Sequence, residues 1–360
     1  MTPPKVSLTR RLLTVLTTST LLIGGSAAAA NAAPINVPWS PDASSDTEVE
    51  FVSDGITYYG SLRAPVGQQR GAALLLPGSG PIDRNGNVVA DNVTPNTLAY
   101  VAEDLASHGI TTLRFDKFGS GRTGDGGVDA TDLRGFTEQV DTAQAAAMFL
   151  SNRTGISGSD FAVLGHSEGG LTALALTERI PDIGKLGLLA PLSIRYFDLL
   201  HAQLNRSFDN AVAVGQFTPA EADALRVRLD ETIAALRAGE PAPYPDDEVL
   251  ATLGLAGPNA RFLTEADKFD PADLASALPA GTDVLLTCSD KDLNVSCGQT
   301  DRLFDALSGT DVEYARLVNS SHMLGELGPL PATGFDIYAP LPQSAEFDGV
   351  LRGWAGRSFD

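Results

Sequence analysis

The stretch FAVLGHSEGGLTALALTER, residues 161–179, joins an apolar run of strand type to a run of helical type through one glycine-flanked serine. Its centre, residues 165–169, reads GHSEG. Between a strand and a helix, this pattern predicts a turn so tight that Ser167 has strained backbone geometry and an exposed hydroxyl. The flanking glycines remove Cβ atoms that would collide there. An ordinary glycine-rich turn with an idle serine is the alternative, but the strand and helix on either side favour a nucleophile.

Outward from this turn, the chain alternates short apolar runs with helix-like stretches. Such alternation is typical of an α/β fold with a mostly parallel central sheet and helices on both faces. We expect the other strands at residues 48–52, 56–62, 72–76, 110–115, 186–189, 284–287 and 312–318. We expect the helices at residues 98–105, 138–150, 169–179, 300–307 and 345–354.

The alternation stops at residues 191–278, where no apolar run of strand type occurs. Thr218-Pro219-Ala220-Glu221 forms a capping box there, ahead of leucines and an isoleucine at helical spacing. We therefore expect residues 191–278 to form a helical lid inserted into an α/β core. Residues 47–190 are the first part of that core and residues 279–360 the second.

Residues 1–32 are typical of a cleaved secretory signal peptide. Basic residues precede an apolar run over 12–25, and Ala30-Asn31-Ala32 offers the small-x-small pattern that a signal peptidase cleaves. At about 14 residues, the apolar run is shorter than the ~20 that a membrane-spanning helix needs. We therefore expect a mature chain that begins near Ala33, with a flexible lead-in over 33–46. We expect it to be secreted or retained in the periplasm or cell envelope, without a membrane anchor.

The composition excludes several classes of partner and of chemical site. The 360 residues are 43% apolar and 19% charged, as in globular domains. A net charge of -20 repels nucleic acid and anionic membranes, so we expect neither as a partner. Two cysteines and four histidines are too few for a thiolate zinc site or an iron–sulfur cluster. The glycine-rich loops lack the third glycine of a dinucleotide-binding motif and the Gly-Lys-Ser/Thr of a phosphate-binding loop, so we do not expect nucleotide binding. We therefore expect the chemistry to come from oxygen nucleophiles or carboxylates, with no metal.

A serine hydroxyl needs a general base to act as a nucleophile at neutral pH, and that base is usually histidine. His166 adjoins the serine on a tight turn and is expected to point elsewhere. His108 and His201 are interpreted as surface, solvated or core residues. His322 follows the last expected strand, at the edge of the sheet where open α/β sites lie. We predict that His322 is the base, with a structural histidine as the alternative.

The residue that orients this histidine should be a carboxylate in the loop after the strand 284–287. Asp290 and Asp292 both qualify, and a separation of two residues on a loop does not decide between them. We favour Asp292, with Asp290 as a solvated loop acid. The resulting order, Ser167, Asp292, His322, is the order found in α/β-hydrolases.

An oxyanion hole requires two backbone N–H groups, one after the nucleophile and one from the loop after the strand 72–76. These groups belong to Glu168 and Ser79. The loop Pro77-Gly78-Ser79-Gly80-Pro81 is small enough for the backbone to approach a substrate carbonyl closely. An ordinary turn is the alternative interpretation of this loop.

These motifs resemble those of a secreted bacterial α/β-hydrolase. The segment 77–86, PGSGPIDRNG, is similar to the Gly-Ser-Gly-Pro-x-Asp-Arg segment of an esterase branch near the serine aminopeptidase and dienelactone-hydrolase-like groups. The segment 113–121, LRFDKFGSG, is similar to that branch's Arg-x-Asp-x-Arg-Gly-x-Gly segment, with Phe118 where arginine is usual. The segment 285–295 is similar to its acid loop, which places the acid on Asp292 and leaves Ser289 where glycine is usual.

The resemblance covers about residues 47–354 and implies an acyl hydrolase with a serine nucleophile and no cofactor. We predict a monomeric esterase that cleaves carboxylic esters through an acyl-enzyme, with a small-molecule acyl substrate as its partner. A peptidase or amidase of the serine aminopeptidase type is the alternative, because the same triad cleaves amides. A non-catalytic binder of an apolar ligand is a third possibility. Asp83 and Arg84 either pair behind the oxyanion loop or contact substrate, and we favour the structural role.

Two further expectations concern the surroundings of the site. Cys288 and Cys297 bracket Asp292, and export permits a disulfide, so we expect them to pair and stiffen the acid loop. Two free thiols are the alternative. The insertion offers four apolar side chains that either line the pocket or form the lid's own core: Leu199, Leu204, Phe208 and Phe217.

Overall fold

The computed structural model describes residues 46–65, 67–88, 93–127, 134–333, 336–339 and 341–359. The expected signal peptide, residues 1–32, and nearly all of the lead-in, residues 33–46, lie outside these ranges. Within the described ranges, no helix is both long enough and apolar enough to cross a membrane.

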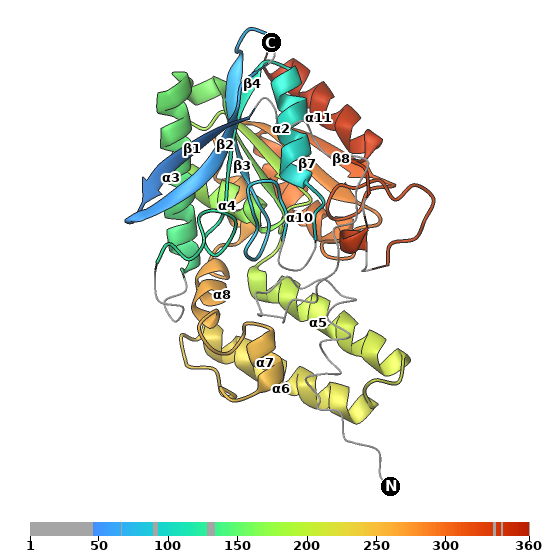
Figure 1. The fold of residues 1–360 in the computed structure, drawn as a ribbon. Helices are drawn as coiled ribbons and strands as arrows, with labels where there is room; N and C mark the ends of the chain where they lie inside the picture. The colour runs from blue at the N-terminus through green and yellow to red at the C-terminus, as the bar shows by residue number, and fades with distance from the viewer. Residues whose placement is uncertain are drawn as a thin grey trace.

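An eight-stranded sheet forms the centre of the described chain, in the order β1-β2-β4-β3-β5-β6-β7-β8 (Figure 1). Its strands are β1 Asp46–Ser53, β2 Ile56–Arg63, β3 Gly71–Leu76, β4 Ile110–Phe115, β5 Phe161–His166, β6 Lys185–Leu189, β7 Asp283–Ser289 and β8 Asp311–Leu317. Strand β2 pairs antiparallel with both β1 and β4, and all the other neighbours are parallel. The carboxyl ends of the parallel strands therefore share one edge, where an open α/β sheet places its site.

Helices cover both faces of this sheet. Apolar side chains of α2 and α11 pack on one face, and those of α3, α4 and α10 pack on the other. These helices are α2 Thr97–Ser107, α3 Phe136–Thr154, α4 Glu168–Thr177, α10 Cys297–Ala306 and α11 Ala345–Ser358. Strands β3 and β5 are buried along their whole length, which explains their continuous apolar runs. The expected mostly parallel sheet with helices on both faces is confirmed.

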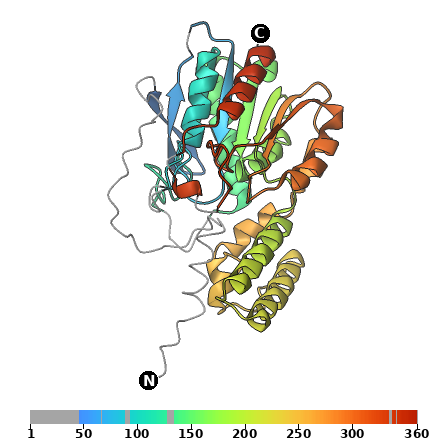
Figure 2. The same ribbon diagram turned by 90° about the vertical axis from the view of Figure 1, so that its right-hand side faces the viewer.

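Five helices lie between β6 and β7, where the sequence lacks strand patterns. They are α5 Tyr196–Ala213, α6 Pro219–Arg237, α7 Glu248–Thr252, α8 Ala260–Ala266 and α9 Pro271–Ser276. Figures 1 and 2 show α5–α8 projecting from one end of the sheet. The capping box begins α6, because Glu221 N–H donates to Thr218 Oγ1 at 3.2 Å and Thr218 N–H donates to Glu221 Oε2 at 2.7 Å. The buried side chains of this helical insertion join the apolar core beneath α3 and α4.

Candidate active site

Ser167 stands at a sharp turn between β5 and α4. Its backbone has φ 55° and ψ -121°, a conformation that costs an L-residue free energy and persists only where its surroundings enforce it. A Cβ on Gly165 would lie 2.0 Å from the carbonyl oxygen of Gly169, and one on Gly169 would lie 2.3 Å from that of Leu76. Only glycine fits at either position, so the backbone itself holds the serine at the strand end.

His322 lies beside this serine and carries a hydrogen-bond chain to Asp292. His322 Nε2 is 3.0 Å from Ser167 Oγ, and His322 Nδ1 is 2.7 Å from Asp292 Oδ2. The other oxygen of Asp292 accepts from the N–H groups of Asn294 at 2.7 Å and Val295 at 2.9 Å. The backbone of its own loop therefore aims the carboxylate at the imidazole.

Asp290, the other acid that the sequence leaves open, lies apart from this chain. Its carboxylate accepts a hydrogen bond from Arg316 Nε at 2.6 Å at the surface. The structure thus brings Asp292 together with His322 and Ser167, and it does not bring Asp290 to them. Of the other histidines, His201 is exposed beside Asp230, and His108 ends α2.

His166 has a structural role that was not predicted from the sequence. Its buried ring donates from Nε2 to the carbonyl oxygen of His322 at 2.8 Å. Burial, together with the neighbouring His322, lowers the pKa of His166 to about 4. The ring is therefore neutral at pH 7, and it holds the backbone of the candidate base in place. The contact joins residues 156 positions apart, so no local pattern could reveal it.

The two expected oxyanion donors flank the serine. Glu168 is the first residue of α4, where a backbone N–H has no acceptor within its own helix. Ser79 lies in the loop after β3 and lines the cavity beside Ser167. A Cβ on the neighbouring Gly78 would be 3.3 Å from Ser167 Cβ, so this loop passes directly over the nucleophile.

The side chain of Glu168 lies in a buried polar network. Its carboxylate is 1% exposed and receives hydrogen bonds from Lys117 Nζ at 2.9 Å, Gln139 Nε2 at 3.0 Å and the Tyr196 hydroxyl at 2.7 Å. Burial opposes ionisation of this carboxyl, but the charge of Lys117 and these hydrogen bonds outweigh it, so the pKa of Glu168 lies below its usual value. The side chain after the nucleophile is thus an ionised, fully engaged carboxylate.

A cavity of about 70 Å³ opens beside Ser167 and His322. Helix α5 supplies one of its walls through Tyr196, Leu199, Leu200 and Gln203, which recur at helical spacing on one face. The remaining walls are mostly apolar and include Ile82, Leu98, Leu192, Val295 and Met323.

Of the four apolar residues named from the sequence as pocket lining or lid core, Leu199 lines this cavity. Leu204, Phe208 and Phe217 are not among the residues that line it, and they are buried in the apolar core. All four candidates therefore belong to the buried core, and Leu199 also faces the site.

The two loop motifs meet through Arg84 and Asp116. Arg84 donates from Nε at 3.1 Å and from Nη2 at 2.7 Å to the two oxygens of Asp116. Asp83 does not pair with Arg84; its Oδ1 accepts from the N–H groups of Asn85 at 2.8 Å and Asn87 at 2.9 Å. Both residues hold the loop, as favoured from the sequence, although each does so with other partners.

A disulfide joins Cys288, at the end of β7, to Cys297, at the start of α10, with 5.3 Å between their Cα atoms. The disulfide thus links the two ends of the loop that carries Asp292. In the described part of the chain, no group of three histidine, cysteine or acidic side chains is arranged to hold a metal ion.

Fold and site together place the chain among the α/β-hydrolases. Residues 94–326, more than half of the chain, match the serine aminopeptidase family, S33. The chain belongs to this family, and it is a hydrolase. No curated protein matches the sequence.

Solved structures show the same fold at low sequence identity. The esterase of Pyrococcus furiosus is 14% identical, with a TM-score of 0.52 over 83% of this chain and 91% of its own. Proline iminopeptidase of Mycobacterium smegmatis is 17% identical, with a TM-score of 0.52 over 87% and 98%. A 2,6-dihydroxy-pseudo-oxynicotine hydrolase is 14% identical, with a TM-score of 0.51 over 87% and 68%. Ester and peptide hydrolases thus share this architecture, and the likeness alone does not choose between them.

Proposed function

We propose that this hydrolase is a serine esterase that cleaves neutral carboxylic esters with an apolar acyl or alcohol group. The observation that carries the proposal is the hydrogen-bond chain from Ser167 through His322 to Asp292, set beside a largely apolar cavity. Such a chain supplies a nucleophile, a base and an orienting carboxylate in one unit.

In this mechanism Ser167 Oγ attacks the ester carbonyl carbon while His322 Nε2 takes the hydroxyl proton. Asp292 holds the ring in the required tautomer and stabilises the imidazolium. The imidazolium then protonates the leaving alkoxide oxygen as the carbon–oxygen bond breaks, so that an alcohol departs and an acyl-enzyme remains. Water repeats the two steps, releasing the acid and regenerating the serine.

The charge that develops on the carbonyl oxygen needs donors that are already in place. The N–H groups of Glu168 and Ser79 flank Ser167 and would donate to that oxygen. Glu168 also begins α4, whose amino end carries a partial positive charge. These interactions strengthen as the tetrahedral intermediate forms, and therefore they accelerate the chemical step.

An ester substrate fits this cavity better than an aminopeptidase substrate does. A substrate with a free amino terminus is a cation at neutral pH, and its burial is costly unless a carboxylate pairs with it. Among the described residues, none of those that line the cavity is acidic. The nearby carboxylates of Glu168 and Asp292 are already engaged by Lys117 and His322.

Assays with matched leaving groups test this choice. A series of p-nitrophenyl esters from acetate to octanoate is compared with alanine and proline p-nitroanilides, using the wild type and Ser167→Ala. We expect saturable hydrolysis of the esters by the wild type alone and little release from the aminoacyl anilides. Preferred cleavage of the anilides would replace the esterase with an aminopeptidase.

We further propose that the protein works outside the cytoplasm and that the helical insertion acts as a lid. The leader pattern over residues 1–32 and the Cys288–Cys297 disulfide support export, because disulfides persist in oxidising compartments. The wall that α5 contributes to the cavity supports the lid. Amino-terminal sequencing of the exported protein should start near Ala33, and retention of Met1 would contradict export by cleavage.

A further inference from the structure

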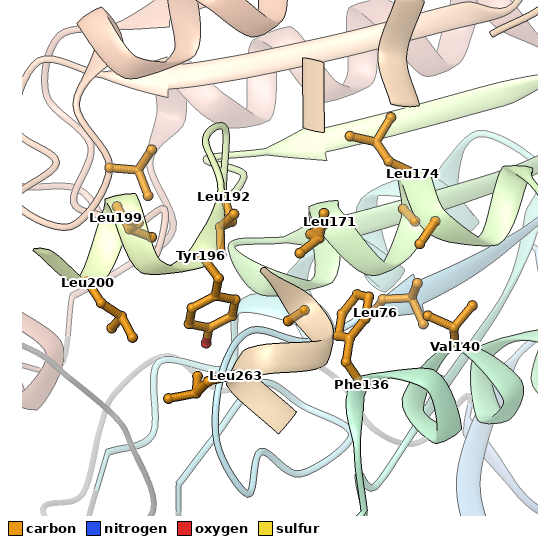
Figure 3. Close-up of a cluster of buried hydrophobic side chains, with 14 of the residues drawn as sticks. Leu76, Phe136, Val140, Leu171, Leu174, Leu192, Tyr196, Leu199, Leu200 and Leu263 are labelled. Atoms are coloured by element: carbon orange, nitrogen blue, oxygen red, sulfur yellow. The ribbon is translucent and has the colours of Figure 1, made fainter. Parts of the chain in front are cut away.

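The residue that begins α5 reaches back to the candidate oxyanion hole. The Tyr196 hydroxyl lies 2.7 Å from Glu168 Oε2 and 3.1 Å from Ser79 Oγ, and the side chain is 4% exposed. Figure 3 shows its ring in the same cluster of apolar side chains as Leu192 and Leu200. One phenol therefore links the insertion, the turn after Ser167 and the loop after β3.

The ionised carboxylate of Glu168 sets the direction of these hydrogen bonds. A carboxylate only accepts, so the Tyr196 hydroxyl must donate its single hydrogen to Glu168. The Tyr196 oxygen is then left to accept from the Ser79 hydroxyl. The hydroxyl hydrogen of Ser79 is thus used by Tyr196, and the backbone N–H of Ser79 remains as the donor toward a substrate.

Lys117 fixes the orientation of that N–H group. Its ammonium donates to Glu168 Oε1 at 2.9 Å and to the carbonyl oxygen of Gly78 at 3.0 Å. The carbonyl of Gly78 and the N–H of Ser79 belong to one planar trans peptide, in which the two groups point in opposite directions. A cation that holds the carbonyl on one side therefore turns the N–H to the other.

We propose that Lys117 and Tyr196 are positioning residues, which use the Glu168 carboxylate as a common anchor to aim the Ser79 N–H into the oxyanion hole. Glu168 itself provides the other N–H group, so one buried side chain ties the two donors together. This inference rests on the proposed esterase function. It extends that function by making the geometry of the oxyanion hole depend on Tyr196, the first residue of α5.

Two variants test the proposal, with Tyr244→Phe as the matched control. Tyr244 is a phenol of the insertion that bonds to Glu231, and it is not among the residues that line the cavity. Loss of one aligned oxyanion donor typically lowers kcat about 100- to 1000-fold. We expect Lys117→Met to lower kcat about 100-fold and Tyr196→Phe about 10-fold, with KM nearly unchanged, because the oxyanion exists only in the transition state. Tyr244→Phe should match the wild type.

Hydrogen exchange of the loop peptide 77–82 provides a readout that needs no turnover. We expect faster exchange there in Tyr196→Phe than in Tyr244→Phe, at equal melting temperatures. Lys117→Met leaves a buried carboxylate without its cation, and if that variant does not fold, Tyr196→Phe decides alone. A Tyr196→Phe enzyme with unchanged kcat and unchanged exchange would overturn the proposal, as would a loss confined to KM.

The same experiment separates the two proposals. If the wild type cleaves no ester yet exchange in the 77–82 peptide rises in Tyr196→Phe, the esterase function fails, whereas Tyr196 still holds the loop that carries Ser79. If the wild type is active and both readouts of Tyr196→Phe stay at wild-type values, the esterase function stands and the positioning role fails.

Discussion

The turn that carries Ser167 and the helix α5 beside it are held in place by different means. Backbone groups fix the turn, since the carbonyl of Ser167 accepts from the N–H groups of Gly170 and Leu192, each at 2.9 Å. Side chains hold α5 at both ends of the site. Tyr196 binds Glu168, and Gln203 Nε2 donates to the carbonyl oxygen of Asn294 at 2.9 Å in the acid loop.

Because of this difference, the turn and α5 should tolerate substitution to different degrees. A turn built from backbone leaves almost no choice of residue, and substitutions within it should destroy the site. A helix held by side chains can be altered one contact at a time, which should change rate or substrate range while the triad stays intact.

The largest effect is expected within the triad. Asp292→Asn should lower kcat about 10,000-fold, because an amide favours the wrong histidine tautomer and does not stabilise the imidazolium. The matched change Asp290→Asn removes only a surface partner of Arg316 and should leave kcat near that of the wild type. Steady-state kinetics on one ester compare the two, and equal losses would show that the acid has been misassigned.

A large loss of stability is expected at the turn. Gly169→Ala places a Cβ 2.3 Å from the carbonyl oxygen of Leu76, and overpacking of this kind costs about 1–3 kcal/mol. Gly298→Ala in α10 meets no atom within 4 Å, and it should stabilise slightly because alanine favours helix. Denaturant unfolding measures both, and a Gly169→Ala protein of wild-type stability would contradict the steric origin of the turn.

A smaller and more selective effect is expected in α5. Leu200→Ala enlarges the cavity and should lower kcat/KM for the shortest ester about tenfold, while longer esters lose less. Leu204→Ala removes a buried side chain of the core and should cost about 2–5 kcal/mol of stability without moving the chain-length preference. A kinetic series of ester lengths distinguishes the two, and identical length profiles for wild type and Leu200→Ala would remove α5 from the substrate pocket.

The smallest effect is expected far from both regions, on α11. Burial, followed by the nearby Asp104, raises the pKa of Asp348 to about 7 from its ordinary value of 3.8. The folded protein then binds more protons than the unfolded chain between these values, so its stability falls as pH rises through that window.

Asp348→Asn should remove this fall, which melting temperatures between pH 4 and pH 8 would measure. The exposed Asp305→Asn on α10 serves as the control and should keep the wild-type slope. A wild-type slope in Asp348→Asn would assign the pH dependence to another group.

Sequence reasoning found those features that the backbone imposes. The strands buried on both faces required continuous apolar runs, and the turn at Ser167 required glycines, so both left local patterns. Asp292 was favoured over Asp290 from the sequence, and a resemblance in the acid loop supported that choice. In the structure, Asp292 contacts His322, and the backbone N–H groups of Asn294 and Val295 orient its carboxylate.

Contacts between distant segments left no such pattern. Lys117 and Glu168 are 51 positions apart, and Tyr196 and Ser79 are 117 positions apart. Each could equally have been a solvated surface residue. Their burial depends on how α5 and the loop after β3 meet, which no local periodicity encodes. The structural role of His166 was not predicted for the same reason, because its contact with His322 joins distant segments.

Labelling with a fluorophosphonate probe tests most directly whether Ser167 is an activated nucleophile. The wild type, Ser167→Ala and His322→Ala are incubated with the probe, and the adduct is located by peptide mass spectrometry. We expect a single adduct on Ser167 in the wild type, none in Ser167→Ala, and labelling slowed at least about 100-fold in His322→Ala. A folded wild-type protein that stays unlabelled, or one labelled at another serine, would contradict the proposed esterase.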